Sequence, residues 1–167
     1  MFNWKTIVGA AMGIVMATSA IATTNTPRVY NEGWEIGPSA EGYFESHVCD
    51  AYVDMGTKSL AIAVIDFNKW GLIFSHPVLR QMYGTQIEGK YPFYLKFSHL
   101  KHAFRLHSYL DEGILYVPAD MDFVTHAQKA HYVDLYIGNR KLARYNLAGS
   151  TFAIGALRMC LSYEKNK

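Results

Sequence analysis

The side chains best suited to bind a metal ion are seven histidines, five of which fall in two clusters. These five are His99, His102, His107, His126 and His131. Residues in a strand alternate between its two faces, so His99 and His102 would point to opposite sides. His126 and His131 are five residues apart, a poor spacing for one face of a helix. Neither cluster adds cysteine or carboxylate ligands at a metal-site spacing, so we expect no metal and no cofactor.

A hydrolase would need a nucleophile beside a base, and the sequence holds only scattered parts of such a site. It contains no G-x-S-x-G motif. Asp66, Asp134 and the histidines could still meet in three dimensions, because triads are defined by geometry. Ser150 follows a glycine, but a serine at that position is expected to cap a helix. We therefore expect no enzymatic activity and no catalytic residue, with a cryptic hydrolase as the weakest alternative.

The aromatic residues favour a binding surface. The chain has 12 tyrosines, 9 phenylalanines and 3 tryptophans. Four tyrosines fall on the more polar faces of predicted strands, namely Tyr94, Tyr109, Tyr132 and Tyr136. A large, rigid and amphipathic ring suits contact with a protein or a glycan. The alternative is that such tyrosines lie beneath a second layer and donate to backbone carbonyls.

The first 22 residues indicate the compartment. Lys5 precedes an apolar run from Thr6 to about Met16, and small residues follow up to Ala22. This order is typical of a secretory signal peptide, cleaved here after Ala22. A membrane anchor is the alternative, but the run is shorter than the roughly 20 residues of a spanning helix. We expect a periplasmic or secreted protein in which residues 23–167 form one domain, with no transmembrane span after cleavage.

The charge balance excludes two classes of partner. Lysines and arginines number 16 against 14 acidic residues, and Lys5 lies in the predicted signal peptide. The mature chain is therefore close to neutral and has no block of like charges. Such a balance gives no excess of positive charge that would attract nucleic acid or an anionic membrane.

The chain has two cysteines, Cys49 and Cys160. Neither belongs to a C-x-x-C motif, so redox catalysis is not expected. Two cysteines in an exported chain are expected to pair, because the compartment is oxidising. Two buried free thiols, or one cysteine kept for a partner, are the alternatives. The loop that a Cys49–Cys160 bond closes is long, and the chain-entropy model gives it about 4 to 5 kcal/mol.

The elements that must position these residues are mostly short strands. We predict strands over residues 48–53, 60–67, 70–75, 92–97, 102–110, 114–117, 132–137 and 142–147. The second is apolar on both faces and reads as a central strand. Residues 78–92 are expected to form a loop with an edge strand, and Asp120 to cap a short helix over 121–130. Strands separated by turns at this spacing predict an antiparallel sandwich or barrel.

The last segment differs, because its apolar residues follow a helical period. Ser150 is predicted to cap a helix from Thr151 to about Tyr163. One stripe holds Ala153, Ala156, Leu157, Cys160 and Leu161. Small residues let a helix approach a sheet closely, and the second cysteine shares their face. We therefore expect the helix to cover the sheet and a disulfide to fix it to the strand that contains Cys49.

The same segment carries a resemblance. Its residues Leu147-Ala148-Gly149-Ser150, Ala153, Ala156-Leu157 and Cys160 resemble the L-x-G-[ST]-x-x-A-x-x-A-L-x-x-C ending of small exported alphaproteobacterial proteins. The β-rich body with a closing helix is also similar to the invasion-associated locus B family of envelope proteins. The resemblance implies a periplasmic, non-enzymatic envelope protein and carries no catalytic residue.

These inferences together predict an exported protein that binds another protein or an envelope component. The first alternative is a periplasmic inhibitor or immunity protein that blocks a toxin or a wall-degrading enzyme. It would present a loop, Gln81 to Lys90, to the cleft of its target. The second alternative is the cryptic hydrolase.

Overall fold

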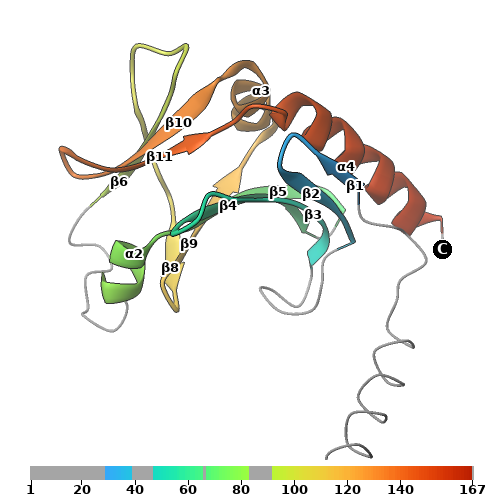
Figure 1. The fold of residues 1–167 in the computed structure, drawn as a ribbon, viewed down its shortest axis with the longest axis horizontal. Coiled ribbons are helices and arrows are strands. Elements are labelled where there is room, and N and C mark those ends of the chain that lie inside the picture. Colours follow the sequence, from blue (N-terminus) through green and yellow to red (C-terminus); the bar gives the residue numbers. More distant parts are fainter. Residues whose placement is uncertain (1–28, 39–46, 66, 83–91, 167) are drawn as a thin grey trace, which may run out of the picture.

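The computed structural model describes residues 29–38, 47–65, 67–82 and 92–166 (Figure 1). The predicted signal peptide, Asp66 and residues 83–90 of the predicted inhibitory loop lie outside the described residues.

Strands make up about half of the described chain. They are β1 (Val29–Asn31), β2 (Trp34–Pro38), β3 (His47–Asp54), β4 (Ser59–Ile65), β5 (Lys69–Ser75), β6 (Phe93–Phe97), β7 (Phe104–Arg105), β8 (Tyr109–Asp111), β9 (Ile114–Ala119), β10 (Tyr132–Ile137) and β11 (Arg140–Asn146). The helices are α2 (Pro77–Met82), α3 (Met121–Lys129) and α4 (Ser150–Lys165).

The strands form two antiparallel sheets. The seven-stranded sheet has the order β1-β2-β3-β4-β5-β9-β8, and the four-stranded sheet has the order β11-β10-β6-β7. The chain builds β1 to β5 in the first sheet, moves to the second for β6 and β7, and returns for β8 and β9. The predicted antiparallel β fold with a C-terminal helix is confirmed. Of the two predicted forms, the described strands make two sheets rather than one closed barrel.

The four-stranded sheet and α4 lie side by side over the same face of the seven-stranded sheet (Figure 1). The core lies between these layers. Tyr145 of β11 is fully buried there, with its ring edge-on to Phe74 of β5 at 5.0 Å between centroids. Its hydroxyl donates to the carbonyl of Ser75 at 3.1 Å, so one side chain joins the two sheets.

The apolar patterns of the longer strands are confirmed. β4 is the fourth of seven strands, and Ile62, Ala63 and Val64 on its two faces are all buried. In β10, Val133 and Leu135 are buried in the core, as the alternation predicts.

Two predicted segments differ from the structure. Residues 102–110 do not form one strand: β7 pairs with β6 in the four-stranded sheet, and β8 pairs with β9 in the other. The chain crosses between the sheets here, and Leu106 packs in the core that both sheets share. The alternation of apolar and polar residues therefore continues where the chain passes from one sheet to the other. For that reason residues 102–110 have the pattern of a single strand.

The second difference is α2, which replaces the first part of a predicted loop with an edge strand. Proline suits the first position of a helix, where its missing N–H is not needed, and Pro77 occupies it. The backbone N–H of Val78 donates to Nδ1 of His76 at 3.2 Å. Leu79 is fully buried and holds the helix against the core. Six residues are too few to show a helical period in the sequence.

The predicted cap of α3 is confirmed, and the predicted cap of α4 is wrong. Oδ1 of Asp120 accepts from the N–H of Phe123 at 2.9 Å at the start of α3. At α4 the cap residue is Gly149, with a left-handed φ of 80° and no side-chain cap. Ser150 is the first helical residue, and its hydroxyl donates to the carbonyl of Ala127 at 2.8 Å. That bond joins α4 to α3.

The tight turn before α4 explains why a glycine stands there. A Cβ on Gly149 would lie 2.9 Å from Cβ of Glu32 and 3.0 Å from the Trp34 ring. The indole N–H of Trp34 also donates to the carbonyl of Ala148 at 2.6 Å. The chain therefore enters α4 pressed against the start of β2.

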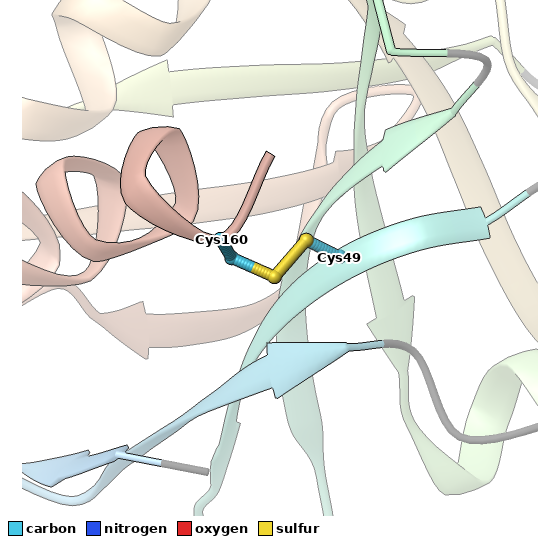
Figure 2. The surroundings of a disulfide bond; sticks show 2 residues. All are labelled: Cys49 and Cys160. Atoms are coloured by element: carbon cyan, nitrogen blue, oxygen red, sulfur yellow. A yellow bond between two sulfur atoms is a disulfide. The ribbon is translucent and has the colours of Figure 1, made fainter. Parts of the chain in front are cut away.

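The predicted attachment of α4 to the sheet is confirmed. The helix packs on β2 and β3, and its buried residues include Ala153, Ala156, Leu157 and Cys160. Figure 2 shows the bond that joins Cys160 of α4 to Cys49 of β3, across a separation of 111 residues in the chain. Both cysteines are buried.

Candidate binding surface

The outward side of the four-stranded sheet carries most of the predicted surface residues. In an antiparallel sheet, residues directly opposite one another on neighbouring strands share a face. Starting from Tyr132, Asp134 and Tyr136 of β10, the register places six more residues on the same face. We call this set the outer face: Tyr94, Lys96, Arg105, Tyr132, Asp134, Tyr136, Lys141, Arg144 and Asn146.

One line of the outer face crosses all four strands. Arg105 of β7 is opposite Tyr94 of β6, which is opposite Tyr136 of β10, which is opposite Lys141 of β11. We call these four residues the tyrosine row. Neighbouring strands are about 4.8 Å apart, so the row spans roughly 14 Å between its end strands. It places two tyrosines side by side with a cation at each end.

The next line is built around a carboxylate that is nearly out of solvent. Asp134 has a side chain only 6% exposed, and it accepts from Nε and Nη2 of Arg144 at 2.7 and 2.9 Å. Nζ of Lys141 lies 3.7 Å from the same carboxylate. Burial alone would raise the pKa of Asp134, but the hydrogen bonds and charges of Arg144 and Lys141 outweigh it and hold that pKa below its usual value.

Arg144 is fixed on its other side as well. Its guanidinium lies 3.5 Å from the centroid of the Tyr132 ring, a cation–π contact. The hydrogen bonds that Arg144 donates to Asp134 also raise the pKa of Arg144, so it stays charged at any ordinary pH. One face of the Tyr132 ring is thus covered by the Arg144 guanidinium. The other two tyrosines of the outer face, Tyr94 and Tyr136, are the ones that belong to the tyrosine row.

The structure brings together three of the four tyrosines predicted as a surface. Tyr94, Tyr132 and Tyr136 share the outer face, whereas Tyr109 lies on β8 of the other sheet. There it is 65% exposed and stacks on Tyr116 at 6.3 Å between centroids. The alternative that a tyrosine lies beneath a second layer and donates to a backbone carbonyl describes Tyr145 instead.

Sequence reasoning missed the cations of this face. Lys96, Arg105, Lys141 and Arg144 are spread over four strands, and only the register collects them. The alternation in each strand was a usable signal, since it places Lys96 beside Tyr94 on the polar side of β6.

The two histidine clusters meet at one point. Nε2 of His99 lies 3.1 Å from Nδ1 of His126, and both rings pack near Phe97. Desolvation, aided by the charges of His126 and Lys129, lowers the pKa of His99. In the described residues, no group of three or more histidine, cysteine or acidic side chains could hold a metal ion.

The residues considered for a hydrolase have other contacts in the structure. Asp134 is bound by Arg144, and the Ser150 hydroxyl donates to Ala127. Among the helices that the structure describes, none is long and apolar enough to cross a membrane.

The described residues define a class of fold: two antiparallel sheets closed by a helix that a disulfide attaches to one of them. The crystal structure of invasion-associated protein B from Bartonella henselae is similar to it in fold. The match has a TM-score of 0.60 and covers 82% of this chain and 98% of that chain, at 11% sequence identity. The resemblance to that family is thereby confirmed at the level of the fold alone. No family model matches the sequence, and no curated protein matches it.

Proposed function

We propose that this chain is an exported, non-catalytic protein of the cell envelope that binds another protein or an envelope component through its outer face. The observation that carries the proposal is the combination of tyrosines and cations on a sheet face that no described helix covers. α4 packs on β2 and β3, and α3 packs on α4 and β9. Arg105, Lys141 and Arg144 are accordingly exposed.

Three observations support export. The first 22 residues have the order of a signal peptide. The Cys49–Cys160 disulfide suits an oxidising compartment such as the periplasm. The fold is that of invasion-associated protein B, as described above.

The sheet face is preferred to the inhibitory loop. That alternative depends on residues 81–90, of which Gln81 and Met82 complete α2 and the rest lie outside the described residues. The outer face joins tyrosines and cations on four paired strands, and that combination is the reason for the preference.

A comparison of matched tyrosine variants tests the proposal. Mature protein is immobilised and incubated with a detergent extract of the native envelope, as wild type, as Tyr94→Ala/Tyr136→Ala and as Tyr109→Ala. Partners recovered with wild type and Tyr109→Ala but lost with the double variant would support the outer face. Equal recovery with all three proteins, each with an unchanged melting curve, would contradict it.

A further inference from the structure

We infer that the tyrosine row binds an anionic oligosaccharide whose sugar rings carry carboxylate groups. The inference rests on the proposed function, because it names the ligand class for the same outer face. It follows from the charge of that face, the order of residues in the row and the fixed position of Arg144.

Charge is concentrated on this face out of proportion to the whole chain. The chain has 16 basic and 14 acidic residues, whereas the outer face has four cations and one carboxylate. That carboxylate, Asp134, is already engaged by Arg144 and Lys141. Within the described residues, no acidic side chain pairs with Lys96 or Arg105. The face therefore attracts anions, and a complementary ligand must be acidic.

The order of residues in the row selects among acidic ligands. A sugar ring has a flat face of C–H groups that stacks on an aromatic ring, and a tyrosine also offers a hydroxyl for hydrogen bonding. One residue of a glycan chain advances by roughly one strand spacing, about 5 Å. Two successive sugars would lie over Tyr94 and Tyr136, and their carboxylates would reach Arg105 and Lys141 at the two ends.

Arg144 adds a donor whose position is set before the ligand arrives. A guanidinium has five N–H donors, and Asp134 takes only two of those of Arg144. The contact with Tyr132 fixes its plane. A donor held in this way loses less conformational entropy on binding a carboxylate than a free side chain does. Asp134 and Tyr132 thus act as positioning residues for Arg144.

Other anionic ligands fit less well. Nucleic acid would require a larger net positive charge than this nearly neutral chain has. An acidic peptide would satisfy the cations, but its binding would not depend on two tyrosines placed side by side between them. The oligosaccharide uses all four residues of the row.

Isothermal titration with a defined probe tests the inference. The full mature protein is titrated with a tetramer of galacturonic acid and, separately, with a neutral tetramer of galactose. We expect saturable binding of the acidic tetramer that weakens with added salt, and at least tenfold weaker binding of the neutral one. Tyr94→Ala/Tyr136→Ala and Arg105→Ala should each weaken binding at least tenfold, while Tyr109→Ala should leave it unchanged.

The contrary outcomes separate the ligand class from the proposed function. Binding of poly-glutamate that needs Arg105 but neither tyrosine, with no binding of the uronate, would replace the oligosaccharide with an acidic peptide. No binding of the tetramer, while envelope partners still depend on Tyr94 and Tyr136, would overturn the ligand class and keep the proposed function. No binding of the tetramer, together with envelope partners that do not depend on Tyr94 and Tyr136, would overturn the ligand class and the proposed function alike. Unchanged melting curves show that each variant is folded.

Discussion

Asp134 shows how one residue can lie on an outward face and still be buried. Its neighbours across the strands are Lys96 on one side and Arg144 on the other, and the Arg144 guanidinium donates two hydrogen bonds to its carboxylate. Its pKa is lowered from 3.8 because the ionised carboxylate binds Arg144. A carboxyl group with a lower pKa in the folded state stabilises the fold above its unfolded pKa. That stability is lost as the pH falls through the folded pKa.

The first prediction follows from that sign. Asp134→Asn should lower the free energy of unfolding at pH 7 by about 1 to 3 kcal/mol. The substitution removes the buried carboxylate that binds Arg144, and the cost is limited because the Arg144 side chain is partly exposed. The difference from wild type should shrink as the pH falls from about 4, the pKa of an aspartate in the unfolded chain, toward the lower folded pKa of Asp134. Urea denaturation at pH 7 and pH 3 measures both values. Asp111→Asn, at an exposed position of β8, is the control and should stay within roughly 0.5 kcal/mol of wild type at pH 7.

The second prediction concerns the His99–His126 contact. Two imidazoles without a third described ligand are expected to bind a metal ion only weakly. Purified protein should therefore retain no stoichiometric zinc, copper or nickel after dialysis against a weak chelator, measured by elemental analysis. One bound equivalent that disappears in His99→Gln would contradict this and identify the pair as a site.

For single residues, the sequence predicted the face of a strand on which a side chain lies better than the partner that the side chain contacts. Alternation correctly placed Tyr132, Asp134 and Tyr136 on the polar side of β10. It did not predict that Asp134 would be buried, because the pairing with Arg144 depends on a register shift between Leu135 and Tyr136. A bulge of that kind leaves no local signal in the residues.

Helix α4 is the element whose packing the sequence predicted most closely. Sixteen residues give several turns, so the apolar stripe is unambiguous. Helix α2, with six residues, offers one turn and a half and was predicted as a loop with an edge strand. The length of an element thus decided whether its period could be recognised.

The third prediction tests the close packing of α4. Ala153 is fully buried and Ala156 is 6% exposed, so leucine at either position should overpack the contact and cost about 1 to 3 kcal/mol. Arg158 lies on the exposed side, and Arg158→Ala should stay within roughly 0.5 kcal/mol of wild type. Denaturant melts with the disulfide intact measure all three. Equal stability of the leucine variants and wild type would show that α4 is not packed in this way.

The arrangement of the whole molecule was the part least accessible to sequence reasoning. Local patterns predicted antiparallel strands and a closing helix, yet they left a sandwich and a barrel equally open. The answer depends on pairings between distant segments, such as β5 with β9 and β6 with β10. The outer face is formed by those pairings, so the sequence alone could not predict that its four cations share one face.

The fourth prediction concerns the disulfide. Oxidised mature protein should have no free thiol, and a tryptic digest should contain the Cys49 and Cys160 peptides joined. Cys160→Ser should destabilise the protein by about 2 to 5 kcal/mol, the usual range for native bonds in small exported domains. Labelling of both thiols in unreduced native protein would contradict the bond.

The fifth prediction concerns export of the whole chain. Mature protein should begin at Thr23 and be recovered from the periplasm or the medium, as intact-mass measurement of each fraction would show. A cytoplasmic chain that still starts at Met1 would contradict it. A version that lacks residues 2–22 is the control and should stay in the cytoplasm with reduced cysteines.

The separation of 111 residues between the two cysteines has a consequence for the cellular machinery that the proposed export would require. A chain that crosses a membrane from its N-terminus presents Cys49 long before Cys160, so the first thiol waits unpaired and open to capping by small thiols. With two cysteines in the chain, only one intramolecular pairing exists, and no incorrect bond within a chain needs to be reshuffled. Maturation should therefore depend on a thiol oxidase and be indifferent to the loss of a disulfide isomerase.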